Sequence, residues 1–177
     1  HLGLSEFHAF RDLYHVRGRE EALLNDQMRQ RYDVLADEMQ RPFDGIPAWL
    51  QMLKDEGATL IVCSVRHPYN SAPLLEKMGL LSYFDDVWGN NEGAGRDTKA
   101  KVLRYELAKA CIEPRQAVMI GDKDFDCMAA KANGLFMLGC AYGFGSIPEL
   151  HRYKADLIIS SPKQGQQVTR ILRRRKH

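Results

Sequence analysis

Cysteine is scarce in this 177-residue sequence, and no two cysteines have the CxxC spacing of a zinc or redox motif. The four, each in an apolar or helical stretch, are Cys63, Cys111, Cys127 and Cys140. We expect buried free thiols in a reducing compartment such as the cytoplasm. Long apolar runs are also missing: none approaches the roughly 18 residues that a membrane span needs, and the N-terminus has no signal-peptide core. The composition therefore predicts neither a disulfide scaffold nor a membrane partner.

Acidic residues are absent after Asp156, where only basic charges follow. These are Lys163, Arg170, Arg173, Arg174, Arg175 and Lys176. Residues 1–156 carry 19 basic and 23 acidic side chains, a net charge of −4. The formal charge of +2 over the whole chain is therefore due to the basic residues after Asp156, and we expect no nucleic acid partner. With 45% hydrophobic residues and charges of nearly balanced sign, the chain is predicted to fold rather than to remain disordered.

Glycine motifs that bind nucleotides are missing too. Neither GxGxxG nor GxxxxGK[ST] occurs, and we interpret Gly143-Phe144-Gly145 as part of a turn-rich loop. A calcium loop that starts at Asp122 fails as well, because Cys127 stands at its glycine position and Asn133 at its glutamate position. The ends of the predicted strands are then the places to look for chemistry.

Helical periodicity dominates residues 4–40, where Ser5 can cap a short first helix. Apolar residues then recur at three- and four-residue steps in a stretch that is otherwise rich in charge: Leu23, Leu24, Met28, Tyr32, Leu35 and Met39. Such a helix buries one face only, and Pro42 and Gly45 mark its end. We interpret residues 1–42 as a small, incomplete helical cap that is separate from residues 43–177.

From residue 43 onward, apolar strands alternate with helices. We expect helices at about 47–56, 70–78, 99–110, 125–133 and 163–174, and strands at 59–63, 86–88, 117–120, 136–139 and 156–160. Strands that are apolar throughout are typical of a parallel sheet. The predicted fold class is therefore α/β, a Rossmann-like parallel sheet with helices on both faces, and such a sheet binds ligands at the carboxyl ends of its strands.

The strongest local signal runs from Gly121 to Asp126. Asp122 directly follows a buried strand and Asp126 lies in the first turn of the next helix, so both carboxylates can face the same space. Converging carboxylates repel each other unless a hard cation such as Mg2+ lies between them, and Gly121 gives a ligand room to approach. Alternatively, both aspartates cap the helix and complement its dipole. Spacing alone leaves both interpretations open.

Ser64 and Lys99 are the other candidates. Ser64 ends a predicted strand, where its hydroxyl and the N–H groups of the following turn suit a phosphate oxygen. A serine in this place can equally well only end the strand. Lys99 opens a helix, where a cation is unfavourable by roughly 0.3–1 kcal/mol, which indicates a nearby anion. Lys101 competes with Lys99 for this role.

Taken in order, Ser64, Lys99 and the stretch Gly121-Asp122 to Asp126 resemble the second, third and fourth motifs of the haloacid dehalogenase-like phosphatases. Over about residues 40–162 the sequence is similar to the phosphoglycolate phosphatase-like branch of that family. The resemblance implies a Mg2+-dependent phosphatase that acts on a small phosphorylated metabolite. It implies that Ser64 holds the phosphate together with the Val65 N–H and Arg66, and that Lys99 neutralises the phosphate and the nucleophile. By the same resemblance, Asp122 binds Mg2+ and Asp126 is a second ligand or its partner.

The sequence departs from the family at the first motif. The family uses an aspartate nucleophile and a second aspartate two residues later, on a strand that precedes the cap. No such strand precedes residue 40, and Pro42 stands where the first aspartate belongs. Because the chain begins with His1 rather than methionine, we expect that this strand was removed by truncation, that the chain alone is inactive, and that its open sheet edges favour a homodimer. The alternative is a non-catalytic module that binds phosphate, metal or a protein partner.

Overall fold

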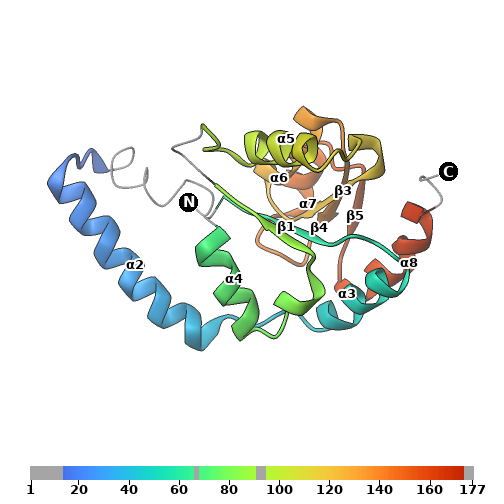
Figure 1. The fold of residues 1–177 in the computed structure, drawn as a ribbon, viewed down its shortest axis with the longest axis horizontal. Helices are drawn as coiled ribbons and strands as arrows, with labels where there is room; N and C mark the ends of the chain where they lie inside the picture. The colour runs from blue at the N-terminus through green and yellow to red at the C-terminus, as the bar shows by residue number, and fades with distance from the viewer. Residues whose placement is uncertain (1–13, 66–67, 91–94, 174–177) are drawn as a thin grey trace. The chain divides into compact units, whose positions relative to one another are not determined.

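The computed structural model describes residues 14–65, 68–90 and 95–173. The chain divides into two compact units, His1–Arg41 and Pro42–His177 (Figure 1). The described part of the first unit consists mainly of α2 (Arg19–Met39), which is the helix that the apolar periodicity predicts. The predicted cap at Ser5 lies outside the described residues. That the first unit is part of a cap over an active site stays a prediction.

In the second unit, short strands alternate with helices. The strands are β1 (Ile61–Cys63), β2 (Asp86–Trp88), β3 (Val118–Gly121), β4 (Phe136–Cys140) and β5 (Leu157–Ile159). The helices are α3 (Ile46–Asp55), α4 (Pro68–Lys77), α5 (Lys99–Lys109), α6 (Asp124–Asn133), α7 (Ile147–Arg152) and α8 (Pro162–Arg173), with 3-10 turns η1 (Leu81–Tyr83) and η3 (Pro114–Gln116). The predicted elements agree with these bounds to within two residues, and α7 is the helix that has no counterpart among them.

Every strand pairing is parallel, which confirms the predicted fold class. The strands form two ladders, one of β1 with β2 and one in the order β3-β4-β5. Among the described residues no ladder joins β1 to β3. Each of these two strands therefore has one edge whose backbone N–H and C=O groups lack a strand partner in this part of the chain. The sequence predicts one sheet, and the structure instead has a break in it between β1 and β3.

Helices cover the strands from two sides. Helix α5 packs against α6, and α3 packs against α8 on the other side (Figure 1). Strand β4 is buried between them, because Met137 belongs to one apolar cluster and Leu138 and Cys140 belong to the other. Strand β3 is covered differently. Its Met119 is buried, whereas Val118 and Ile120, which point to the opposite face, are 37% and 39% exposed.

A buried hydrogen bond fixes α3 to α8. The indole N–H of Trp49 donates to the Thr169 hydroxyl at 3.1 Å, and Trp49 is 3% exposed. Gly165 makes this contact possible, because a Cβ there would collide with the Trp49 ring. The end of α6 is also set locally: Gly134 adopts a left-handed φ of 73° and closes the helix directly after residue 133, where the predicted helix ends.

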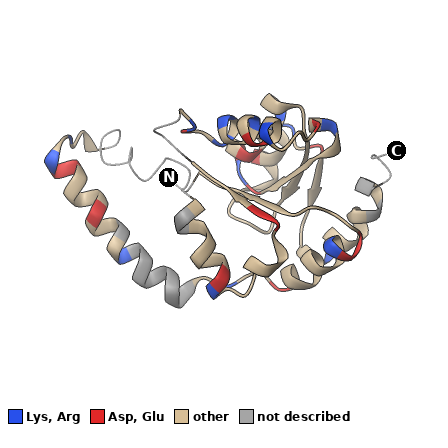
Figure 2. Ribbon diagram, in the orientation of Figure 1, with Lys and Arg blue, Asp and Glu red and all other residues tan. Residues whose placement is uncertain are grey.

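The cysteines are free thiols, as expected, but they are not uniformly buried. Cys127 and Cys140 are buried, Cys63 is half-buried, and Cys111 at the end of α5 is exposed. The prediction of burial is therefore wrong for Cys111, which follows the C-cap of α5 and adopts a positive φ of 53° in the turn there. Helix α5 has four basic side chains, Lys99, Lys101, Arg104 and Lys109, and one acidic side chain, Glu106 (Figure 2). No helix in the described ranges has the length and apolar character that crossing a membrane requires.

Candidate active site

Lys99 is held at the start of α5 by an ion pair with Asp126. The Lys99 ammonium donates to Oδ1 of Asp126, although the two residues are 27 positions apart. Both side chains are largely buried, with 12% of Lys99 and 4% of Asp126 exposed. The carboxylate therefore offsets the unfavourable position of a cation at a helix N-terminus. Lys101 instead forms an exposed pair with Asp97 at 2.7 Å, so of the two candidate lysines only Lys99 reaches this edge of the fold.

Asp126 is also the cap of the turn between β3 and α6. Its Oδ2 accepts the backbone N–H groups of Asp122 and Lys123, both at 3.0 Å. Since Oδ1 contacts Lys99, each oxygen of this carboxylate has a protein partner. This is what the helix-capping interpretation of Asp126 requires. Gly121 gives room to Asp126 rather than to a ligand, because a Cβ at Gly121 would collide with that carboxylate. The expected role of Gly121 is therefore corrected.

Asp122 is enclosed by the loop that follows β4. One carboxylate oxygen, Oδ2, accepts the backbone N–H of Phe144 at 2.5 Å. The loop approaches so closely that a Cβ at Gly143 would collide with the Asp122 carboxylate, and one at Gly145 with the Asp122 carbonyl oxygen. The sequence analysis treats these glycines only as turn residues. The two glycines stand on either side of the residue that donates this N–H, and that spacing is the signal that the sequence contains. Its role can be recognised only in the structure, where the loop lies against Asp122.

A second contact ties the same region together. Glu149 of α7 accepts the Lys123 ammonium at 2.7 Å and the backbone N–H of Asp124 at 3.3 Å. The N–H of Glu149 in turn donates to the Ser146 hydroxyl, which caps α7. The sequence Ser146-Ile147-Pro148-Glu149 has the serine and glutamate spacing of a capping box. That pattern predicts α7 and could have drawn attention to Glu149.

The donor set fits one Mg2+ ligand rather than two. Mg2+ in proteins usually takes one or two carboxylates and completes its shell with water and phosphate oxygens. Oδ1 of Asp122 has no hydrogen-bond partner within the described ranges, so it is available to a cation. Both oxygens of Asp126 are already engaged. No cluster of three or more side chains with metal-ligating groups occurs in the described part of the chain.

Ser64 follows β1, where its N–H donates to the Trp88 carbonyl of β2 at 2.9 Å. The neighbouring Cys63 lies within electrostatic range of Lys99 and Asp126, so the carboxyl ends of β1 and β3 share one edge. Burial raises the pKa of Cys63 to about 11, which keeps it a neutral thiol. Val65 is exposed. Arg66 lies outside the described residues.

Known proteins resemble this chain in sequence and in fold. The sequence model of the haloacid dehalogenase-like hydrolases matches residues 1–140. A 5'-nucleotidase of Pseudomonas aeruginosa is 31% identical over 134 residues, which is 73% of this chain and 61% of that protein. A phosphoglycolate phosphatase of Agrobacterium fabrum is 32% identical over 119 residues, 67% of this chain and 51% of that protein. A predicted phosphatase from Clostridium acetobutylicum superposes with a TM-score of 0.83 at 30% identity, covering 94% of this chain and 76% of that one. The chain thus spans about half to three fifths of these curated relatives.

Proposed function

Because this chain belongs to the haloacid dehalogenase-like hydrolases, we propose that it is a Mg2+-dependent phosphatase that hydrolyses a small phosphate monoester. The observation that supports this most is the meeting of Lys99, Asp122 and Asp126 at the carboxyl edge of the strands. Phosphoryl transfer depends mainly on positioning and charge stabilisation, which such a group of charges can provide. Its relatives include a phosphoglycolate phosphatase and a 5'-nucleotidase, which favours a small phosphorylated substrate.

In this proposal Lys99 binds the phosphate. Its ammonium has three N–H donors, and Asp126 accepts one of them, so two can reach phosphate oxygens. With only 12% of the side chain exposed, its charge is poorly screened by water and acts strongly on a bound anion. Ser64 and the Val65 N–H would bind the other phosphate oxygens, because they follow β1 at the same edge, and the resemblance adds Arg66.

Asp122 is the residue that we propose as the Mg2+ ligand. Bound Mg2+ would neutralise charge on the phosphoryl oxygens. The Phe144 N–H fixes one oxygen of Asp122 and thereby orients the other. Asp126 acts behind Asp122 in this arrangement, since it holds the Asp122 N–H and Lys99. Of the two roles that the resemblance allows for Asp126, we therefore favour that of a partner over that of a direct ligand.

The reaction also needs a carboxylate nucleophile, and the sequence before β1 contains no two aspartates spaced two residues apart. Both strands beside the break end at this site, because Cys63 of β1 lies within electrostatic range of Lys99 and Asp126, and β3 ends directly before Asp122. We propose that a strand that carries the nucleophile pairs in this break. Its last residue would then reach the phosphate, because the carboxyl ends of parallel strands meet at one edge.

Hydrolysis of p-nitrophenyl phosphate with Mg2+ tests this function. The protein encoded by the full gene is expected to turn over the ester, Asp122→Asn in that protein to lose most of the activity, and residues 1–177 alone to have negligible turnover. Lys101→Gln is the matched control, because Lys101 pairs with Asp97 away from the site. Equal activity of the wild type and Asp122→Asn would contradict the metal role, and robust hydrolysis by residues 1–177 would contradict the argument about the nucleophile.

The missing aspartates favour one second candidate, a non-catalytic module that binds phosphate, metal or a protein. Absence of turnover by the protein of the full gene, together with retained Mg2+ or phosphate binding, would select it. Under either proposal we place the protein in the cytoplasm, since its four cysteines are unpaired.

A further inference from the structure

Lys123 stands between two of the acidic residues at the end of β3, and its side chain has a choice of partners. Its ammonium contacts Glu149 at 2.7 Å, with 20% of Lys123 and 24% of Glu149 exposed. The carboxylates of Asp124 and Asp122 also interact electrostatically with this ammonium. The Lys123 ammonium is therefore attracted by three carboxylates at once.

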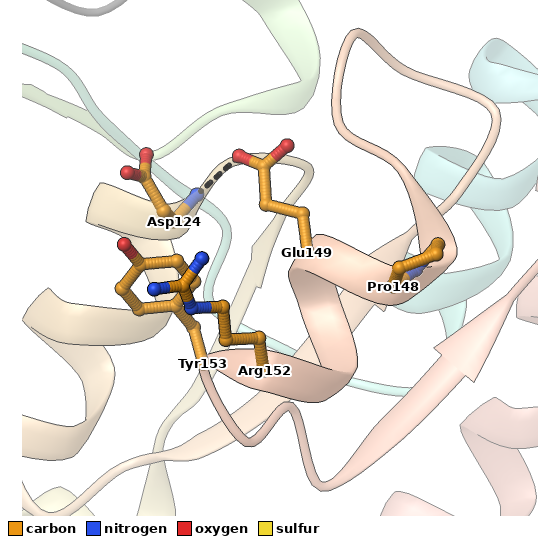
Figure 3. Close-up of a pocket in the computed structure, with 5 residues that line it drawn as sticks. All are labelled: Asp124, Pro148, Glu149, Arg152 and Tyr153. Carbon is orange, nitrogen blue, oxygen red and sulfur yellow. Dashed lines mark hydrogen bonds between the residues drawn. The ribbon is translucent and has the colours of Figure 1, made fainter.

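Of these three carboxylates, Glu149 is the one that contacts the Lys123 ammonium directly. Its Oε1 accepts both the Lys123 ammonium and the Asp124 N–H, so it is fixed against the start of α6 (Figure 3). It belongs to the segment that also supplies the Phe144 N–H to Asp122. Removal of the Glu149 charge would leave Asp124 and Asp122 as the carboxylates that interact electrostatically with Lys123. An ammonium on Asp122 would compete directly with a divalent cation for the free oxygen of that carboxylate.

We propose that Glu149 is a positioning residue that holds Lys123 away from Asp122 and so keeps Asp122 available to a metal ion. This inference rests on the proposed role of Asp122 as the Mg2+ ligand. Glu149 then acts on Asp122 through Lys123, and not only by stabilising the loop. The effect of losing Glu149 must then disappear when Lys123 is also neutral.

A double-mutant cycle on the protein of the full gene tests this. The Mg2+ dissociation constant is measured by titration calorimetry for wild type, Glu149→Gln, Lys123→Met and the double variant. We expect Glu149→Gln to raise the constant about tenfold, and the double variant to lie within about twofold of Lys123→Met. Arg152→Gln is the control and should leave the constant unchanged, because Arg152 lies on the same helix as Glu149 and lines a surface pocket together with it (Figure 3). An equal loss from Glu149→Gln in both backgrounds would overturn the inference, because it would show a purely structural role.

A second readout needs no metal. The amide resonance of Phe144 reports the position of the Asp122 carboxylate that it contacts. In metal-free protein, Glu149→Gln should shift this resonance, and the additional Lys123→Met should return it towards its wild-type position. An unmoved resonance in Glu149→Gln would refute the movement of Lys123 onto Asp122. If the wild type fails to bind Mg2+ while the Phe144 shifts appear as expected, the proposed metal role of Asp122 is wrong and the competition between the two carboxylates still stands.

Discussion

Removal of the Asp126 carboxylate should be the most destabilising charge change in the described part of this site. The substitution Asp126→Ala leaves the Lys99 ammonium without its counter-charge in a place where only 12% of the side chain is exposed. It also removes the acceptor of the Asp122 and Lys123 N–H groups. Breaking a buried ion pair by removing one partner costs about 3–5 kcal/mol. We expect a loss of that size in the free energy of unfolding.

The chain offers a matched control a few residues away. Lys101 and Asp97 also form an ion pair at the start of α5, but their side chains are 54% and 49% exposed. Exposed pairs contribute at most about 1 kcal/mol, because water screens the charges. Asp97→Ala should therefore change the free energy of unfolding by less than about 1 kcal/mol. The two variants compare the same chemistry at different burial.

Urea unfolding followed by tryptophan fluorescence measures both effects, since Trp49 and Trp88 are buried. With a slope of about 2 kcal/mol per molar urea, a loss of 4 kcal/mol moves the midpoint down by about 2 M. If Asp126→Ala does not fold, Asp126→Asn decides the matter, because it keeps an oxygen for the N–H groups and loses the charge. Its expected loss is about 1–3 kcal/mol. Losses from Asp126→Asn no larger than those from Asp97→Ala would refute the reasoning.

Four further predictions concern the rest of the second unit. Gly165→Ala should destabilise the protein by about 1–3 kcal/mol in the same urea assay, because the added methyl group meets the Trp49 ring; a gain in stability would contradict that packing. A backbone N–H that donates to Asp85 lowers the pKa of that carboxyl below 3.8. The free energy of unfolding of the wild type should therefore exceed that of Asp85→Asn above pH 3.8, and the difference should vanish as the pH falls through the lowered pKa. A difference that stays unchanged down to about pH 2 would exclude this contribution of Asp85. A thiol reagent at pH 7.5 should modify Cys111 quickly and the other three cysteines slowly, because burial raises the pKa of each of these three to about 11. Equal rates of modification at all four thiols would contradict this. In residues 1–177 alone, whose open sheet edge we predict to favour a homodimer, Ile120→Lys should weaken the association measured by sedimentation, and an unchanged association constant would contradict a contact at this strand.

The sequence predicts well what depends on neighbours along the chain. The apolar stretch before Asp122 and the glycine after Asn133 give the strand and the helix end where the structure has them. These features depend on local periodicity and on backbone preferences, which a single stretch of sequence contains. The same reasoning identifies Asp126 as both a cap and a site residue, and it could not separate the two roles. Separation required knowing which donors surround each of its oxygens.

Contacts between distant segments were outside the reach of such reasoning. The choice of Lys99 over Lys101 depends on how α5 packs against α6, since two side chains only two residues apart point in different directions from the helix. The Phe144 N–H reaches Asp122 because β4 lies beside β3, with Gly139 opposite Gly121. Local sequence therefore determined which chemical groups stand at the strand ends. The packing of helices and the order of strands decided which of those groups meet, because they alone set the distances between side chains from separate elements.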